Sequence, residues 1–197
     1  MIVAKNKKNQ LEKFEELLLI WNKTHNLISR SQTTNIKEHI KDSLSVSTFL
    51  GKNILDLGSG GGFPGIPIAI NCPDKQVFLI ERKQNKAAFL LNTTNQLGLK
   101  NTKVINNDSS ELDRESFPTP LEIVTRAFGS PYKTIKAVNG LLETPETSLK
   151  LMKTHPPNGL QQIPKSYQID KIEDTGLKGK DKKHILVTIT NKKTSTR

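Results

Sequence analysis

Residues 56–65 read Asp-Leu-Gly-Ser-Gly-Gly-Gly-Phe-Pro-Gly, and this glycine-rich stretch decides the fold of the chain. It follows a short apolar run over 53–57 that is typical of a buried parallel strand, and it leads into a predicted helix over 64–71. Glycines let the backbone turn sharply and approach a ligand closely because they carry no Cβ. The start of the helix adds unpaired N–H groups and the positive end of the helix dipole. We therefore predict a strand–loop–helix unit that cradles a cofactor carboxylate or phosphate at the carboxyl edge of a sheet.

An acidic residue, Glu81, ends the next predicted strand, 76–81. An acid at this position can accept hydrogen bonds from two adjacent ribose hydroxyls, so the loop and the acid together imply a ribose-bearing cofactor. These residues alone do not choose between a dinucleotide and S-adenosylmethionine. The pattern G-x-G-x-x-G over 60–65 matches the dinucleotide fingerprint, but it begins late relative to the end of the strand. Counted from Gly58, the third glycine position is Phe63.

Two other groups of polar side chains lie beside the predicted cofactor site. Asp56 stands at the start of the glycine loop, where it would order the loop amides or approach the cofactor's amino group. Four polar residues follow the predicted strand 102–106, and in a fold of this type they face an adenine ring: Asn107, Asp108, Ser109 and Ser110. Either these side chains read the adenine amino group or they form an ordinary polar turn.

The rest of the chain alternates between strand and helix patterns. Further strands are predicted over 121–127, 148–153, 167–172 and 184–190, and helices over 10–22, 35–50, 84–98 and 132–142, with a polar linker over 26–34. The pattern favours an α/β fold with a doubly wound sheet that ends in a C-terminal antiparallel hairpin. We divide the chain into an N-terminal helical extension (1–50), a cofactor-binding domain (51–190) and a tail (191–197).

The composition favours an intracellular partner of high negative charge. The 197 residues include 30 Lys and Arg against 19 Asp and Glu, a formal net charge of +11. A strongly basic surface concentrates polyanions such as nucleic acid, although a lysine-rich composition also serves solubility alone. The single Cys72 excludes an internal disulfide, and the four histidines show no metal-ligand spacing, so we expect no metal. No membrane span or signal core is visible, and we expect a cytoplasmic monomer.

Four motifs, spread over most of the chain, resemble one known family. They are Trp21-Asn-Lys-Thr-His-Asn-Leu27, His39-Ile-Lys-Asp-Ser43, the loop 56–67 and Thr125-Arg-Ala-Phe-Gly-Ser130. With these motifs the chain resembles the ribosomal RNA small subunit methyltransferase G family, also called glucose-inhibited division protein B. The resemblance implies a Rossmann-like class I methyltransferase fold and S-adenosyl-L-methionine as the cofactor. The implied reaction methylates N7 of a guanine in 16S rRNA (position 527 of the RNA), presented as free RNA or as the small ribosomal subunit.

The resemblance also implies roles for individual residues. The implied cofactor contacts are Gly58, Phe63, Glu81, Ser109, Ser110 and Arg126. Asp56 and Gly60 complete the set of cofactor-binding residues that we predict. Lys153 and Lys183 fall on the RNA-facing side and are the predicted RNA-binding residues.

The chain departs from the family pattern near the predicted RNA-facing side. Thr154 follows Lys153 where the family usually has glycine, and Lys183-His184 stands where arginine-histidine is common. These departures leave open a degenerate member that binds RNA without catalysis. A nicotinamide-dependent (NAD) oxidoreductase that uses the same loop also stays open, as does methylation of a different nucleic acid or of a small molecule.

The implied chemistry gives Arg126 the predicted catalytic role. Guanine N7 has a free lone pair and no proton to lose, so the reaction needs orientation rather than a general base. We expect Arg126 to point toward the cofactor carboxylate or the guanine edge, unless it forms a structural pair with Asp56 or Glu81. We also expect His39 and Asp42 to form a hydrogen-bonded pair that fixes an N-terminal helix against the sheet.

Overall fold

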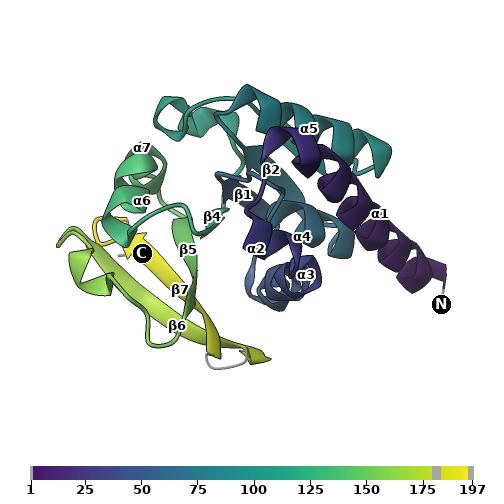
Figure 1. Ribbon diagram of the computed structural model, residues 1–197. Coiled ribbons are helices and arrows are strands. Elements are labelled where there is room, and N and C mark those ends of the chain that lie inside the picture. Colours follow the sequence, from purple (N-terminus) through teal and green to yellow (C-terminus); the bar gives the residue numbers. More distant parts are fainter. Residues whose placement is uncertain (1, 179–182, 195–197) are drawn as a thin grey trace.

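The computed structural model describes residues 2–178 and 183–194 and contains one seven-stranded sheet (Figure 1). Its strand order is β3-β2-β1-β4-β5-β7-β6. Strands β1 to β5 are parallel, and β7 runs antiparallel to both β5 and β6. The strands are β1 (Asn53–Leu57), β2 (Gln76–Ile80), β3 (Thr102–Ile105), β4 (Leu121–Arg126), β5 (Thr147–Thr154), β6 (Tyr167–Lys178) and β7 (Lys183–Asn191).

The central strands are buried on both faces, which explains their continuous apolar sequence. In β1, Ile54 packs into the core on one face of the sheet, whereas Leu55 and Leu57 pack into the core on the other. Successive side chains of a strand point to opposite faces, so a strand between two helix layers needs apolar residues at every position. Strand β1 has β2 as its neighbour on one side and β4 on the other, so the order of the strands reverses at β1. Doubly wound sheets bind ligands at such a switch point.

Helices cover both faces of the sheet (Figure 1). The helices are α1 (Ile2–His25), α2 (Arg30–Thr33), α3 (Ile36–Ser45), α4 (Gly65–Asn71), α5 (Gln84–Gln96), α6 (Pro131–Ala137) and α7 (Asn139–Leu142). Side chains of α1, α3, α4 and α5 fill the core on one face, and those of α6 and α7 fill the core on the other. No helix in these ranges is long and apolar enough to cross a membrane.

The N-terminal helices share a core with the sheet. Phe14 and Leu18 are fully buried, as their helical spacing predicts, and they lie in one cluster with Ile66 and Leu79. This helix is longer than the predicted segment 10–22 because the polar turns at both of its ends continue the helix. The predicted extension 1–50 therefore packs directly against the sheet and its first crossover helix.

Several predicted segments differ from the structure. The linker 26–34 contains the short helix α2, which is stabilised by a capping box between Ser29 and Gln32. The predicted helix 132–142 is divided into α6 and α7 at Val138, whose backbone leaves the helical conformation (φ −125°, ψ +19°). Strand β6 continues beyond the predicted end at 172 as far as Lys178. Of the predicted tail 191–197, residues 195–197 lie outside the described part of the chain.

Candidate active site

The glycine loop is tied to the end of β2 by hydrogen bonds. Gly60 has a φ of +52°, a conformation that favours glycine, and its N–H donates to Oε2 of Glu81 at 3.0 Å. The Ser59 N–H donates to the Ile80 carbonyl at 2.9 Å. The other carboxylate oxygen of Glu81, Oε1, accepts from the Lys83 N–H at 2.8 Å. These hydrogen bonds join the glycine loop directly to the acid at the end of β2.

Asp56 lies beneath the loop and is completely buried. Its Oδ2 accepts a hydrogen bond from the N–H of Gly65, the first residue of α4, at 3.0 Å. A Cβ on Gly65 would lie 2.2 Å from Leu79 Cδ2 and 2.6 Å from Asp56 Oδ2, so only glycine permits this approach. Burial raises the pKa of Asp56 to about 7. Asp56 was predicted either to order the loop amides or to approach the cofactor. In the structure it accepts from the amide that ends the loop, and its side chain does not line the cavity above.

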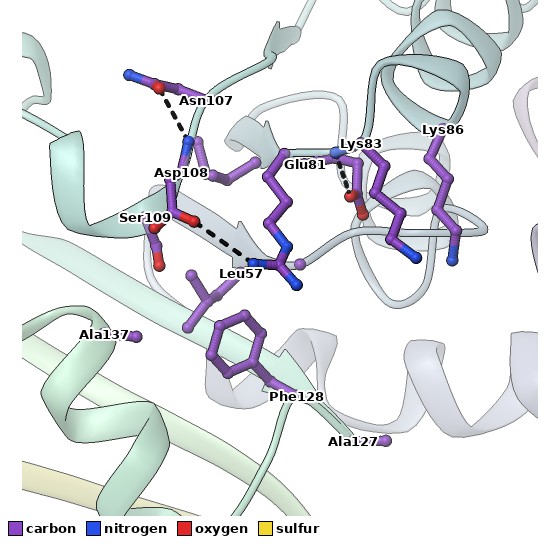
Figure 2. A pocket seen from close by; sticks show the side chains of 13 residues that line it. Leu57, Glu81, Lys83, Lys86, Asn107, Asp108, Ser109, Ala127, Phe128 and Ala137 are labelled. Atoms are coloured by element: carbon purple, nitrogen blue, oxygen red, sulfur yellow. Dashed lines mark hydrogen bonds and ion pairs between the residues drawn. The ribbon is translucent and has the colours of Figure 1, made fainter.

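A cavity of about 440 Å³ opens at the carboxyl ends of β1, β2 and β4, beside the turn after β3 and helix α6. Such a volume is ordinary for a small-ligand site. Figure 2 shows Glu81 on one wall and Asn107, Asp108 and Ser109 on another, with Leu57 and Phe128 between them. The cavity therefore combines hydrogen-bonding groups at its sides with apolar surface suited to a flat ring.

The turn after β3 brings only part of the predicted adenine-side set to the cavity. Ser109 lines the cavity, but Ser110 does not; its hydroxyl donates to Oδ1 of Asp108 at 2.8 Å, and its N–H donates there at 3.1 Å. These two bonds lower the pKa of Asp108. Arg82 lies 3.8 Å from Asp108 Oδ2 and lines the cavity as well. This geometry corrects the prediction for Ser110: the residue lies within a 3₁₀ turn that Asp108 caps, beside the site.

Phe128 is a cavity residue that the sequence reasoning missed. It follows Ala127, which has a φ of +57°, and its side chain is 40% exposed in the cavity. A Cβ on Gly58 would lie 2.7 Å from the Phe128 ring, so the ring rests directly on the glycine loop. The available signal was the aromatic residue in the motif 125–130, immediately after a strand that ends at the switch point.

Arg126 lies outside the cavity, in a buried cluster of charged and aromatic groups. Its guanidinium is 3.0 Å from Nδ1 of His39, 3.5 Å from Oδ2 of Asp42, and 4.9 Å from the ring centre of Phe63. Burial lowers the pKa of Arg126, and the Asp42 carboxylate opposes that shift. Asp42 also binds His184 Nδ1 at 2.7 Å through Oδ1.

This cluster corrects three sequence-based expectations. Arg126 pairs with Asp42, not with the expected partners Asp56 or Glu81, because α3 packs over the end of β4. Within the described residues, no hydrogen bond joins His39 directly to Asp42; both bind Arg126 instead. Phe63, a predicted cofactor contact, is buried beneath that guanidinium and does not line the cavity.

The two predicted RNA-binding lysines lie on neighbouring strands away from the cavity. Lys153 of β5 lines a separate surface hollow beside Ser130 and Pro131. Lys183 begins β7, is exposed, and lies 3.8 Å from Asp174. A candidate metal centre of three or more His, Cys, Asp or Glu side chains is absent from residues 2–178 and 183–194.

The fold is similar to that of a solved S-adenosylmethionine complex and of a solved rRNA methylase. A variant of MtNAS in complex with S-adenosylmethionine superposes with a TM-score of 0.58 at 14% identity, covering 96% of this chain and 77% of that chain. An rRNA methylase from Streptococcus thermophilus gives 0.50 at 15% identity, covering 77% and 94%. Identities this low bear on the fold alone, and the predicted Rossmann-like class I methyltransferase fold is confirmed.

Sequence relatives extend over almost the whole chain. The ribosomal RNA small subunit methyltransferase G of Nitrosomonas europaea is 35% identical over 185 residues, covering 91% of this chain and 86% of the relative. The protein of the same name from Coxiella burnetii is 33% identical over 193 residues, covering 96% and 92%. A family model described as rRNA small subunit methyltransferase G matches residues 7–187. The chain therefore belongs to the rRNA small subunit methyltransferase G family.

Proposed function

We propose that this chain is an S-adenosyl-L-methionine-dependent methyltransferase that methylates guanine N7 in 16S rRNA. One observation carries the proposal: the glycine loop donates, through Gly60, to Glu81, which lines a cavity at the switch point of the sheet. A glycine loop bonded to a strand-end carboxylate on one side of a cavity forms a cradle for a ribose-bearing cofactor. Membership of the family supports the reaction class.

The cavity residues fit an adenosyl cofactor. Each carboxylate oxygen of Glu81 accepts one backbone N–H, and a carboxylate offers about four lone-pair sites, so capacity remains for two ribose hydroxyls. Ser109 and the neighbouring polar turn would face the adenine amino group, and Leu57 and Ile80 would contact the flat faces of the ring. The exposed backbone at Gly58, which lines the cavity, would hold the amino-acid end.

The reaction requires the protein to orient the guanine toward the methyl group. Bound S-adenosyl-L-methionine supplies a methyl group that its sulfonium activates. Guanine N7 offers a lone pair and releases no proton, so the protein must hold the base in line and exclude water. Phe128 presents an aromatic face inside the cavity, where a purine can stack against it.

We assign Arg126 a positioning role in place of direct catalysis. Its contacts with His39 and Asp42 fix the end of β4. Immediately beyond that point the backbone turns through Ala127 and sends Phe128 into the cavity. Loss of the guanidinium would therefore displace the aromatic wall without removing a cofactor contact.

Methyl transfer from labelled S-adenosylmethionine tests the proposal. The purified chain should label small ribosomal subunits isolated from cells without this gene, and mapping should find a single N7-methylguanine in 16S rRNA. Calorimetry should detect micromolar binding of S-adenosylmethionine and none of NAD. Binding of RNA and cofactor without transfer would favour a degenerate, RNA-binding member of the family, and binding of NAD would favour the oxidoreductase.

The proposal includes a partner, a location and an assembly state. The substrate is the 16S rRNA, free or within the small subunit, and the excess of positive charge suits an RNA partner. Ribosome assembly takes place in the cytoplasm, so that is the proposed location. The monomer is the proposed state, which light scattering at micromolar concentration would test.

A further inference from the structure

A second hollow, of about 960 Å³, lies next to the cofactor cavity and has no role in the function proposed above. We call it the N-terminal groove. Its walls are the C-terminal end of α1, the segment 26–34 with α2, and the side chain of Lys86 from α5. Polar side chains dominate its rim, and Leu19, Leu27 and Ile28 provide an apolar floor.

The N-terminal groove is electropositive. Three cationic side chains line it: Lys23, Arg30 and Lys86. None of its lining residues is an aspartate or glutamate, and within residues 2–178 and 183–194 no carboxylate lies within ion-pair distance of these three cations. Positive charge in a concave surface concentrates an anionic ligand there.

Hydrogen bonds hold the shape of the N-terminal groove. The Asn22 side chain accepts the Ile28 N–H at 2.9 Å and donates to Thr33 Oγ1 at 3.3 Å. The capping box between Ser29 and Gln32 fixes the start of α2. The segment that carries Arg30 is therefore held against the helix that carries Lys23.

Lys86 connects the N-terminal groove to the cofactor cavity, because it lines both. Its Nζ donates to the Leu27 carbonyl at 3.2 Å, and a Cβ on Gly60 would lie 3.8 Å from the same nitrogen. In Figure 2, Lys86 lies on the same side of the cavity as Glu81, with Lys83 between them in this view. An RNA strand whose target base enters the cavity beside the cofactor would pass Lys86 on its way into the groove.

We propose that the N-terminal groove binds the sugar–phosphate backbone of the RNA strand next to the target guanine. Phosphates would contact Lys23, Arg30 and Lys86, and the adjoining ribose would lie against the floor at Leu19 and Ile28. This inference rests on the proposed function, since it assigns a surface to the same RNA substrate. It adds a binding element, on α1 and α2, to the lysines that the sequence predicts on β5 and β7.

The double variant Lys23→Gln/Arg30→Gln tests the inference. Both side chains are exposed, so the fold should be unchanged by circular dichroism and melting temperature. We expect the KM for small ribosomal subunits to rise about tenfold, with kcat and the calorimetric affinity for S-adenosylmethionine unchanged. The slope of log affinity for the subunit against log salt should become shallower by about 1.5, because two phosphate contacts are lost.

A matched control is Lys52→Gln/Lys103→Gln, which removes the same charge from exposed positions away from both hollows. It should change the KM less than twofold. Equal effects of the two double variants, or a wild-type KM in the groove variant, would overturn the groove assignment. An inactive wild-type enzyme would instead overturn the proposed function, so the two failures are distinguishable.

Discussion

Glu81 holds the cofactor cradle closed through two backbone donors. Its carboxylate oxygens accept separately from Gly60 and Lys83, one on each side. A carboxylate accepts at both oxygens, whereas an amide presents one acceptor and one donor. These two backbone donors therefore favour a carboxylate at position 81, independently of any contact with a ribose.

The variant Glu81→Gln should bind S-adenosylmethionine about 10- to 100-fold more weakly, because the amide nitrogen must face a backbone donor and one charged hydrogen bond is lost. Titration calorimetry measures the effect directly. Glu111→Gln, an exposed change outside the cavity, is the control and should bind normally. Normal binding by the Glu81 variant would remove Glu81 from the cofactor site.

Asp56 makes the stability of the protein depend on pH. Burial raises its pKa from 3.8 to about 7, so between about pH 4 and pH 7 the native state holds a proton that the unfolded state has released. The native state then binds more protons, and stability falls as pH rises through this window. The full effect is of the order of 4 kcal/mol.

Urea denaturation of wild type and Asp56→Asn at steps from about pH 4.5 to about pH 7.5 checks this expectation. The asparagine retains an acceptor for the Gly65 N–H and cannot ionise. The wild-type free energy of unfolding should therefore decline relative to that of the variant as pH rises. Parallel curves for the two proteins would show that Asp56 ionises normally.

At the scale of elements, the close contact between α4 and β1 requires glycine, which has no Cβ, at position 65. Replacement of Gly65 by alanine would drive a methyl group into Leu79 and the Asp56 carboxylate. Overpacking of this kind costs about 1–3 kcal/mol, and the shift of α4 would also distort the loop that precedes it. We expect Gly65→Ala to lower both the melting temperature and the cofactor affinity.

Gly140→Ala is the matched control for that change. Gly140 lies in α7, has no positive φ, and a Cβ there would meet nothing within 4 Å. This substitution should be neutral or raise stability by about 0.4–1 kcal/mol. Thermal denaturation of the two variants separates steric conflict at the loop from a general effect of losing glycine.

The elements differ in how far the sequence could predict them. Strand β1 has its predicted bounds, Asn53–Leu57, because a buried strand followed by glycines leaves little ambiguity. Helix α2 was hidden in a polar segment, since four residues held by a Ser29–Gln32 capping box carry no apolar periodicity. The break at Val138 depends on the fit of two short helices to the sheet, which local propensity does not express.

At the scale of the whole molecule, the cluster around Asp42 links three distant parts of the chain. Asp42 of α3 contacts Arg126 at the end of β4 and His184 of β7. Sequence motifs marked each of these residues, but their pairing could not be predicted, because it depends on how α3 crosses the sheet. For the same reason, the sequence could not predict that Phe63 and Ser110 lie near the cavity but do not line it.

The cluster predicts how Arg126→Ala will behave. We expect the affinity for S-adenosylmethionine to stay within about threefold and kcat to fall by about a hundredfold, because the aromatic wall is displaced while the cradle is retained. The loss of a partly buried ion pair should also lower stability by about 2–3 kcal/mol. Arg126→Lys, which keeps the charge, should recover part of kcat; a collapse of cofactor affinity would mean that Arg126 contacts the cofactor.

The antiparallel strand β7 has a consequence for the order in which the protein matures during synthesis. His184 is 142 residues beyond Asp42, and β7 covers the edge of β5 that would otherwise be open. A nascent chain that has not yet delivered β7 has an unpaired strand edge and a half-satisfied carboxylate beside Arg126. Because β7 follows β1 to β5 in the chain, it leaves the translating ribosome after them and completes the support of Arg126, which a product truncated before β7 would lack.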